Sequence, residues 1–499
     1  MLAVSHWLPE RVSTVLVILT ALTVAAACGY LSRESLDGPI LHWFGGWTPA
    51  TSHKPDVVLG ISFLADPASA AVAAFSAFLF AASLTFAWGY FEEEHSHFQI
   101  LMLLFMAAIS GFCLTHDLFN LFVWFELMSV AAFALTAYPL GKSSLEGAFN
   151  FTITNTFGSY LMLAGIGLLY ARTGTLDFTT MGRLVTRAGS DAVLSGGFCL
   201  VAAALLTKAA IVPFHMWLSD AHAVAPSPVS VIFSGIMVSV ALFGLAKLTG
   251  QVFIHDRDVT TIVHSLFLWL GTVTALIGSV MAFAQRHIKR LLAFSTIAHL
   301  GIMLTGIAAL TPAALDGFLL YLFGHGLVKA TLFMIAGILL ARCNSGDEIT
   351  LYGKARHLWP AGFVMAVAGL MLGGLPVGSL HEATDIFTSR LSVVGVIIIL
   401  STALTGAAVL RVTARAFVGL SGAPGPEITA PTEREREKGN RPLLLMLLPC
   451  VIMSIVALVP GKLFKPFLDH AGDQLMQPLH VGSVAAPEPG LSAISFAPM

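Results

Sequence analysis

Thirteen long apolar runs constrain this chain more than any other feature of its sequence. A helix needs about 20 apolar residues to cross the hydrocarbon core of a bilayer. Unpaired backbone groups in lipid cost several kcal/mol each, and the short alternating strands of a barrel are not found, so each run must be helical. We therefore expect an all-α polytopic membrane protein with about 13–14 transmembrane helices. The runs lie near residues 12–31, 68–88, 98–114, 117–139, 147–170, 192–212, 226–248, 260–283, 291–310, 314–341, 360–380, 391–410 and 443–460.

The composition agrees with a membrane location and excludes several functions. Of the 499 residues, 56% are hydrophobic and 11% are charged, whereas soluble domains are about 25% charged. The formal charge is −2, from 28 acidic and 26 basic residues, which excludes a nucleic-acid role and leaves no polybasic patch for anionic lipid. The sequence has no motif for a nucleotide, zinc or an iron–sulfur cluster, so we expect no cofactor and no metal. If the chain works with a redox enzyme, another chain supplies that chemistry.

The runs suggest four parts along the chain. Residues 1–67 hold the N-terminal span and a stretch in which Gly and Pro flank apolar residues, which favours a short β-hairpin outside the membrane. Residues 68–250 and 251–415 are expected to form two halves, and residues 416–499 a charged loop, the last span and a tail. The stretch 421–442 has the composition of a solvated linker, and after Phe467 the lack of apolar periodicity predicts a tail that is loose or bound to a partner.

The loop charges indicate the orientation. Fourteen Lys and Arg residues fall on the side of the N-terminus and ten on the opposite side. Because basic residues favour the cytoplasmic side, we expect a protein of the cell's inner (plasma) membrane with a cytoplasmic N-terminus.

Glu126 and Lys208 lie inside apolar runs, where a charge costs at least a few kcal/mol. Glu126 is either a proton-binding group or part of a polar seam that ties two helices together. Lys208 lies five residues before Pro213, whose ring disturbs a helix, so we expect a broken helix beside a buried lysine. Broken helices recur at ion sites in transporters. A lysine that reaches the interface is the alternative.

Four further residues could carry protons inside the membrane. His325 and Lys329 are four residues apart and therefore share a helical face. Because histidine titrates near neutrality, the pair is interpreted as two steps of a relay, with a structural core histidine as the alternative. His264 and His299 lie singly inside other runs and are either relay members or core residues.

Both predicted breaks carry polar residues beside them. His215 and His222 follow the first break seven residues apart, which favours the mouth of a water-filled path over a metal site. Pro376 and neighbouring glycines interrupt a later run just before Glu382 and Asp385. Two broken segments, each beside charge, are typical of two repeated transporter halves.

Four motifs carry a resemblance to a known family: FELMSVAAFAL around Glu126, LLTKAAIVPFHMWLSDAHAVAPSPVS around Lys208, QRHIKRLLAFSTIAHLGIM, and GHGLVKATLFMIAGIL around Lys329. Over about residues 60–415 the sequence resembles the antiporter-like membrane subunits shared by respiratory complex I (NADH-quinone oxidoreductase), Mrp-type cation/proton antiporters and membrane-bound hydrogenases of the formate hydrogenlyase type. The resemblance implies two inverted repeats, a Glu126/Lys208 pair, and histidines and lysines along a central polar axis.

Two positions depart from this family. Ser239 stands where the bridging lysine between the halves is usual, so we expect water or a neighbour such as His264 to bridge the gap. Thr384 stands at about the charged position of the second broken helix, with Glu382 and Asp385 nearby.

The favoured function is a proton-translocating, antiporter-like membrane subunit of a multi-subunit redox-driven pump or Mrp-type antiporter, with Na⁺ exchange left open. Its expected partners are other membrane subunits and lipid. The sequence is also compatible with a non-conducting structural subunit, or with a proton-channel subunit of an inorganic-carbon uptake complex. The predicted proton-transfer residues are Glu126, Lys208, His264, His299, His325, Lys329, Glu382 and Asp385, with Pro213 and Pro376 at the breaks and Ser239 at the altered position.

Overall fold

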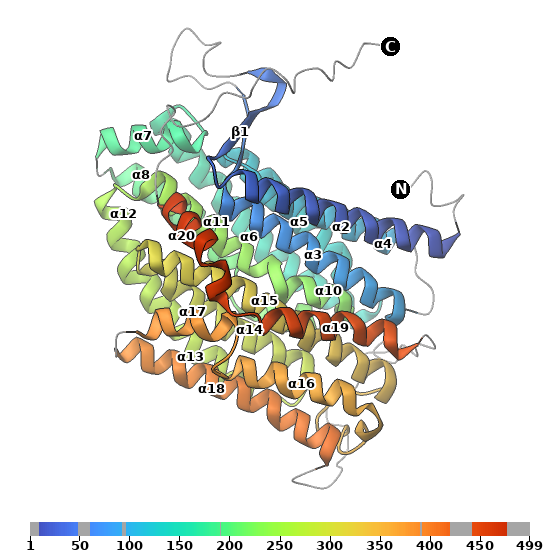
Figure 1. The fold of residues 1–499 in the computed structure, drawn as a ribbon. Helices are drawn as coiled ribbons and strands as arrows, with labels where there is room; N and C mark the ends of the chain where they lie inside the picture. The colour runs from blue at the N-terminus through green and yellow to red at the C-terminus, as the bar shows by residue number, and fades with distance from the viewer. Residues whose placement is uncertain are drawn as a thin grey trace.

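Thirteen apolar helices form the body of the described structure, a computed structural model that describes residues 9–47, 60–91, 96–189, 191–389, 392–419 and 442–476. Ten of them are long and apolar enough to cross a membrane, and three are shorter. Each of the thirteen predicted runs lies on one of these helices, which pack side by side in a bundle (Figure 1). The predicted polytopic all-α fold is therefore confirmed.

The elements follow one another in short connections. The first part contains α2 (Glu10–Glu34), β1 (Ile40–Trp43), β2 (Ser62–Ala65), α3 (Pro67–Tyr90), α4 (Ser96–Leu114), α5 (Leu118–Ala137), α6 (Lys142–Thr173), α7 (Phe178–Ala188), α8 (Ala192–Lys208), α9 (Met216–Val224), α10 (Ser227–Ile232) and α11 (Val238–Leu248). The second part contains α12 (Arg257–Ile262), α13 (Leu268–Ala284), α14 (Ile288–Ala308), α15 (Pro312–Cys343), α16 (Trp359–Leu372), α17 (Ser379–Thr388), α18 (Val393–Thr413), α19 (Leu443–Ala457) and α20 (Lys465–Leu475). Four single π-helical turns extend or join helices, at Phe233–Met237, Thr249–Phe253, Val263–Phe267 and Ala414–Val418.

Aspartate side chains begin many of these helices. Asp66, Asp117 and Asp177 accept hydrogen bonds from backbone N–H groups in the first turns of α3, α5 and α7. Such caps satisfy backbone N–H donors that have no partner within the helix. The aspartates between the apolar runs therefore lie where these helices begin.

The centre of the bundle is formed by two enclosed helices. The span Ser227–Phe253, which combines α10 and α11, and the span of α14 are completely buried along their apolar windows. α13 and α14 approach closely through glycines, because a Cβ on Gly301 would lie 2.5 Å from the backbone of Ala275. Small residues allow such contacts between membrane helices.

Two helices are broken, as the sequence predicts. α8 ends at Lys208 and α9 begins at Met216, with the peptide bond before Pro213 in the cis form between them. α16 ends at Leu372 and α17 begins at Ser379. Gly378, just before α17, has a φ of 86° and a Cβ there would lie 2.4 Å from the Ala457 carbonyl oxygen. Only glycine fits this turn.

Two short strands pair where the sequence predicts a hairpin. β1 and β2 pair antiparallel, with Ile40 opposite Ala65, and they lie at the other end of the bundle from the start of α2 (Figure 1). The hairpin is fastened by the Ser62 hydroxyl, which donates to Asp177 at 2.9 Å. Beside it, His116 is buried and its Nε2 lies 2.9 Å from the Thr179 hydroxyl. Burial lowers the pKa of His116 well below its ordinary value and raises the pKa of Asp177.

The region after the last span differs from its prediction. α20 covers Lys465–Leu475, where a loose or partner-bound tail was expected. Its apolar residues Leu468, Ala471 and Leu475 recur at helical spacing and are buried against the bundle, a pattern too short to stand out in the sequence. The predicted linker at 421–442, except Pro442, and the tail beyond residue 476 lie outside the described residues.

Candidate proton-transfer site

Lys208 is completely buried at the end of α8, directly before the first break. Its Nζ donates to the Ser129 hydroxyl at 2.7 Å. The rings of Phe125, Phe133 and Phe151 surround the ammonium, with centroids 5.1, 5.8 and 5.6 Å from Nζ. A cation is stabilised when it lies over an aromatic face. These rings therefore stabilise the charged form of Lys208 without accepting its proton in a strong hydrogen bond.

Glu126 lies on α5, one turn before Ser129, and accepts a hydrogen bond from the Ser159 hydroxyl of α6. Its charge acts on Lys208, but among the described residues no contact within 4.0 Å joins their charged atoms. The structure therefore places the predicted pair Glu126 and Lys208 near each other, with a serine hydroxyl hydrogen-bonded to each charged group. A hydroxyl can donate and accept in turn, as proton transfer requires.

Lys329 forms the corresponding centre in the second half, completely buried in α15. Its Nζ donates to the Leu292 carbonyl oxygen at 3.2 Å and to the Ser295 hydroxyl, both on α14. His325 lies one turn earlier, also completely buried, and its ring centroid is 5.4 Å from that of His299. The predicted relay residues His299, His325 and Lys329 are thus neighbours.

A tyrosine and a threonine that the sequence analysis did not connect continue this row. His299 Nδ1 lies 2.6 Å from the Tyr321 hydroxyl, and its Nε2 lies 3.1 Å from the Thr405 hydroxyl. Thr384, the residue at the altered position of the second broken helix, is buried on α17, and its hydroxyl donates to the Leu380 carbonyl oxygen of its own helix at 2.8 Å.

Glu382 and Asp385 lie on α17, the same helix as Thr384. They line a cavity of about 560 Å³ together with Asp316 and His381. His381 Nε2 lies 3.3 Å from Asp385, one turn further along α17. The two predicted carboxylates thus lie at the far end of the second half, on the α17 face that borders the cavity.

Further buried polar side chains lie on α9, on α14 and on the span that combines α10 and α11. Ser234 and Thr296 lie 2.6 Å apart between α10–α11 and α14. Ser239 is completely buried and donates to the Ile236 carbonyl oxygen of its own helix at 3.1 Å. His222 is also completely buried, with its ring stacked on Phe333 at 4.5 Å.

Two predicted placements are not found. His264 has an exposed side chain, and its Nδ1 lies 3.0 Å from the Ala308 carbonyl oxygen, so it does not bridge the gap beside Ser239. Hydropathy places a residue within a span but does not show which face it occupies. His215 and His222 do not share a mouth, because His222 is enclosed against Phe333 of α15 while His215 stays half-buried.

Lys247 is a third buried lysine, which the sequence analysis counted among loop residues. Its Nζ donates to the Cys113 and Thr115 carbonyl oxygens at 3.1 and 2.9 Å and to the Ser69 hydroxyl at 3.1 Å. Three acceptors saturate an ammonium group, so this lysine holds the end of α4 in place. Its apolar neighbours in VALFGLAKL are the signal that could have revealed it.

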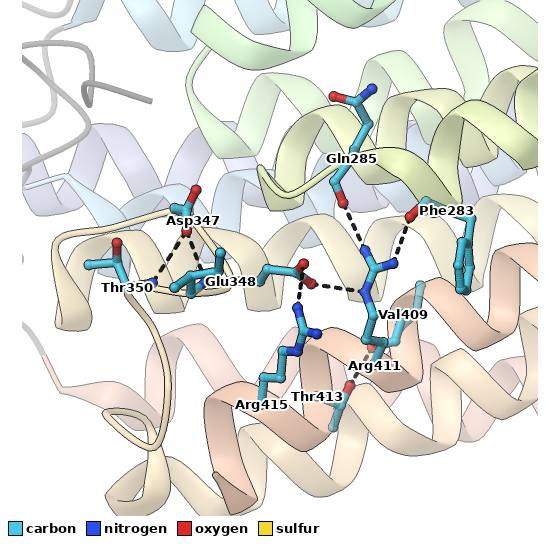
Figure 2. Close-up of polar contacts among 10 residues, drawn as sticks. Phe283, Gln285, Asp347, Glu348, Thr350, Val409, Arg411, Thr413 and Arg415 are labelled. Atoms are coloured by element: carbon cyan, nitrogen blue, oxygen red, sulfur yellow. Dashed lines mark hydrogen bonds and ion pairs between the residues drawn. The ribbon is translucent and has the colours of Figure 1, made fainter. Parts of the chain in front are cut away.

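A buried carboxylate in the connection after α15 binds the end of α18, and an arginine of α18 also binds the α13–α14 corner (Figure 2). Glu348 accepts from Arg411 Nε at 3.0 Å and from Arg415 Nη1 at 2.7 Å. Arg411 also donates to the carbonyl oxygens of Phe283 and Gln285 at 2.6 and 2.8 Å. We refer to Glu348, Arg411 and Arg415 as the arginine clamp.

The fold and these buried charges define an antiporter-like membrane subunit, and comparison with known proteins agrees. The family described as the transmembrane region of NADH:quinone oxidoreductase and Mrp antiporters matches residues 115–410. The chain belongs to this family.

Its relatives include both classes of assembly. The chain is 30% identical over 468 residues to an NADH-quinone oxidoreductase subunit of Desulforudis audaxviator, covering 89% of each chain. It is 28% identical over 396 residues to a Na⁺/H⁺ antiporter subunit of Bacillus subtilis, covering 78% of this chain and 77% of the relative. Such relatives are subunits of larger assemblies, so other membrane subunits are the expected partners of this chain.

Solved structures show the same fold. A chain of the Mrp complex from Dietzia sp. matches with a TM-score of 0.81 at 23% identity, covering 94% of this chain and 93% of that one. A chain of complex I from Thermus thermophilus matches with a TM-score of 0.71 at 19% identity, covering 94% and 96%.

Proposed function

We propose that this subunit moves protons through the row Glu126, Lys208, Ser234 and Thr296, His325, Lys329 and His299 within an Mrp-type or complex I-type assembly. The proposal rests on the hydrogen-bond partners of Lys208 and Lys329. Both are completely buried, yet their described partners are serine hydroxyls and one backbone carbonyl. A buried structural lysine is normally paired or saturated, as Lys247 is.

In this proposal, the exchanged cation and the energy for uphill transport are supplied from outside this chain. An uphill proton must move against about 2.3 kcal/mol per charge per 100 mV. The relatives' names supply two sources, a Na⁺ gradient in antiporter subunits and quinone reduction in oxidoreductase subunits. We propose that the energy reaches this row through contact with a neighbouring membrane subunit.

The outer face around Glu126 supports such a contact. Val123 and Val130, one turn to either side of Glu126 on α5, are 44% and 57% exposed, and Phe157 and Tyr160 beside Ser159 on α6 are 57% and 68% exposed. A carboxylate on an apolar outer face would be costly against lipid. We propose that a partner subunit covers this face, in the plasma membrane and with the N-terminus of this chain cytoplasmic.

The test uses Glu126→Gln and Lys208→Met in the assembled complex. Gln keeps the shape of the side chain but removes the proton-binding charge, and Glu146→Gln on the exposed start of α6 is the matched control. We expect both site variants to lose at least nine-tenths of ΔpH formation in membrane vesicles while the complex stays assembled, and the control to retain it. Near-normal ΔpH in both site variants would favour a non-conducting structural role, which the uncharged Ser239 also suits.

A further inference from the structure

We propose that one acyl chain of a membrane phospholipid occupies an apolar cavity beside the second broken helix, with the phosphate of the same lipid bound at Arg33. The cavity has a volume of about 310 Å³ and lies between α2, α3, α15 and α19. Residues of α17, of α20 and of the 3₁₀ turn Gly461–Phe464 also line it. This inference does not depend on the proton path proposed above.

The walls of this cavity are almost entirely apolar. α3 contributes alanine and phenylalanine side chains, and α15 contributes leucine and phenylalanine side chains. Among the described residues that line the cavity, only Ser32 and Ser379 carry polar side chains, and the Ser32 hydroxyl donates to the Pro67 carbonyl oxygen at 3.1 Å. Apolar cavities of about 150 Å³ stay dry and bind molecules of the size of benzene. This larger cavity therefore favours an apolar occupant over water.

The lining residues that reach the outer surface mark the mouth of the cavity. Gly29 of α2 is exposed, and a Cβ on it would meet no atom within 4 Å. Val456 of α19 and Phe464 are 38% and 48% exposed. α2 and α19 both pack against α3, which lies beside α2 (Figure 1). Because these helices cross the membrane, lipid tails cover this outer surface, and the cavity is continuous with it.

Arg33 lies where the phosphate of such a lipid would be. The cavity is near the hairpin end of the helices, since Gly29 and Ser32 lie in the last two turns of α2, and Ala71 and Ala74 lie in the first two turns of α3. Arg33 follows Gly29 by four residues, so the two share a helical face, and Arg33 is exposed. A guanidinium binds a phosphate through two parallel N–H donors. A phospholipid of the leaflet on the hairpin side can thus bind Arg33 while its chain passes Gly29 into the cavity.

An acyl chain in this cavity would contact the elements at the second break. Ser379, which lines the cavity, is the first residue of α17. Leu320 and Leu468 line both this cavity and the acidic cavity of about 560 Å³. The chain would therefore cover the apolar side of the wall between the two cavities. Because a ligand that binds only the folded state stabilises it, the lipid should raise the thermal stability of the chain.

The experiment compares three site variants of the full chain with two controls. Ala74→Phe fills the cavity, Gly29→Leu narrows its mouth, and Arg33→Gln removes the donor for the phosphate. The matched controls are Ala107→Phe and Arg187→Gln, because both residues are exposed and neither lines the cavity.

The lipid is detected by photochemical cross-linking. The chain is reconstituted in vesicles of phosphatidylethanolamine and phosphatidylglycerol that hold a trace of phosphatidylglycerol with a diazirine in the middle of one acyl chain. Mass spectrometry maps the labelled peptides after illumination. Most of α3 is buried, so labels on its first two turns report a chain in the cavity, whereas labels on the exposed face of α6 around Phe157 report ordinary contact with lipid.

We expect the first two turns of α3 to be labelled in the unmodified chain. Ala74→Phe and Gly29→Leu should lower this labelling at least fivefold and Arg33→Gln at least threefold, while both controls stay within twofold and the labels on α6 stay constant. Added phosphatidylglycerol should raise the unfolding temperature of the unmodified chain in detergent, and it should not raise that of Ala74→Phe.

Equal labelling of α3 in the unmodified chain, Ala74→Phe and Gly29→Leu would overturn the proposal. Competition by a quinone but not by unlabelled phosphatidylglycerol would also overturn it, because the occupant would then be a different molecule. Unchanged labelling in Arg33→Gln alone would refute the position of the phosphate. Should Ala74→Phe fail to fold, Gly29→Leu still decides the question, because it places a better helix former in open space.

Discussion

Removal of the carboxylate from the arginine clamp should measurably destabilise the second half of the bundle. Glu348 is only 3% exposed and accepts from two guanidinium groups. Breaking a fully buried ion pair by removing one partner costs about 3–5 kcal/mol, because the other charge is left unpaired. The side chains of Arg411 and Arg415 are 22% and 28% exposed, so water can partly replace the carboxylate.

The bonds that remain reduce the cost further. Arg411 keeps its two bonds to the carbonyl oxygens of Phe283 and Gln285 when the carboxylate is lost. We therefore expect Glu348→Ala to lower the free energy of unfolding by about 2–3 kcal/mol, below the range for fully buried pairs. Glu348→Gln keeps one acceptor oxygen and should cost less, about 1–2 kcal/mol, near the lower end of the range for a hydrogen bond to a charged group.

The assay is denaturant unfolding of the detergent-solubilised chain, followed by circular dichroism, with Asp258→Asn at the exposed start of α12 as a control of equal charge change. The order of stability should be the control above Glu348→Gln, and Glu348→Gln above Glu348→Ala. Losses under about 0.5 kcal/mol in both Glu348 variants, the size usual for surface substitutions, would refute the reasoning.

Three further perturbations test other parts of the structure. Lys208→Arg should abolish ΔpH formation nearly as fully as loss of the lysine, because a guanidinium does not release its proton; an active arginine variant in vesicles would contradict this. Gly301→Ala should reduce the amount of folded protein severalfold on size-exclusion chromatography, because the new Cβ would lie 2.5 Å from backbone, whereas Gly196→Ala, with no atom within 4 Å, should be neutral. For His116, whose folded pKa lies well below 6.5, the unfolded chain binds the proton first as pH falls. As the pH falls below about 6.5, the free energy of unfolding of the region around the hairpin should therefore decrease by up to about 1.4 kcal/mol per pH unit. Hydrogen exchange measures this decrease, and His116→Gln should remove the pH dependence.

The spans, the hairpin and both breaks could be predicted because each depends on neighbouring residues. Apolar length determines a span, and Pro213 or Pro376 interrupts a helix by its own ring. Glu126 and Lys208 were also found by a local signal, a charge within an apolar run. The structure then adds the serine hydroxyls that lie beside the two charges.

The remaining features depend on contacts between distant parts of the chain. The hydrogen bond between His299 and Tyr321 joins α14 to α15, and nothing near either residue in the sequence indicates it. His264 and His299 have similar apolar surroundings in the sequence, yet one is exposed and the other completely buried. The clamp residue Glu348 finds its arginines more than 60 residues away, after two intervening helices.

The π-helical turn at Phe233–Met237 carries one residue more than an α-helical turn and lies within the enclosed span Ser227–Phe253. Each residue of an α-helix rotates the chain by about 100° about the axis. Shortening this turn by one residue would therefore swing the whole of α11 by about a quarter of a circle. Ser239 would face a different neighbour, and Lys247 would leave the carbonyl oxygens at the end of α4. We therefore expect a one-residue deletion within Phe233–Met237 to disrupt this helix more than a conservative substitution there, because the additional residue sets the angular alignment between the two ends of the helix.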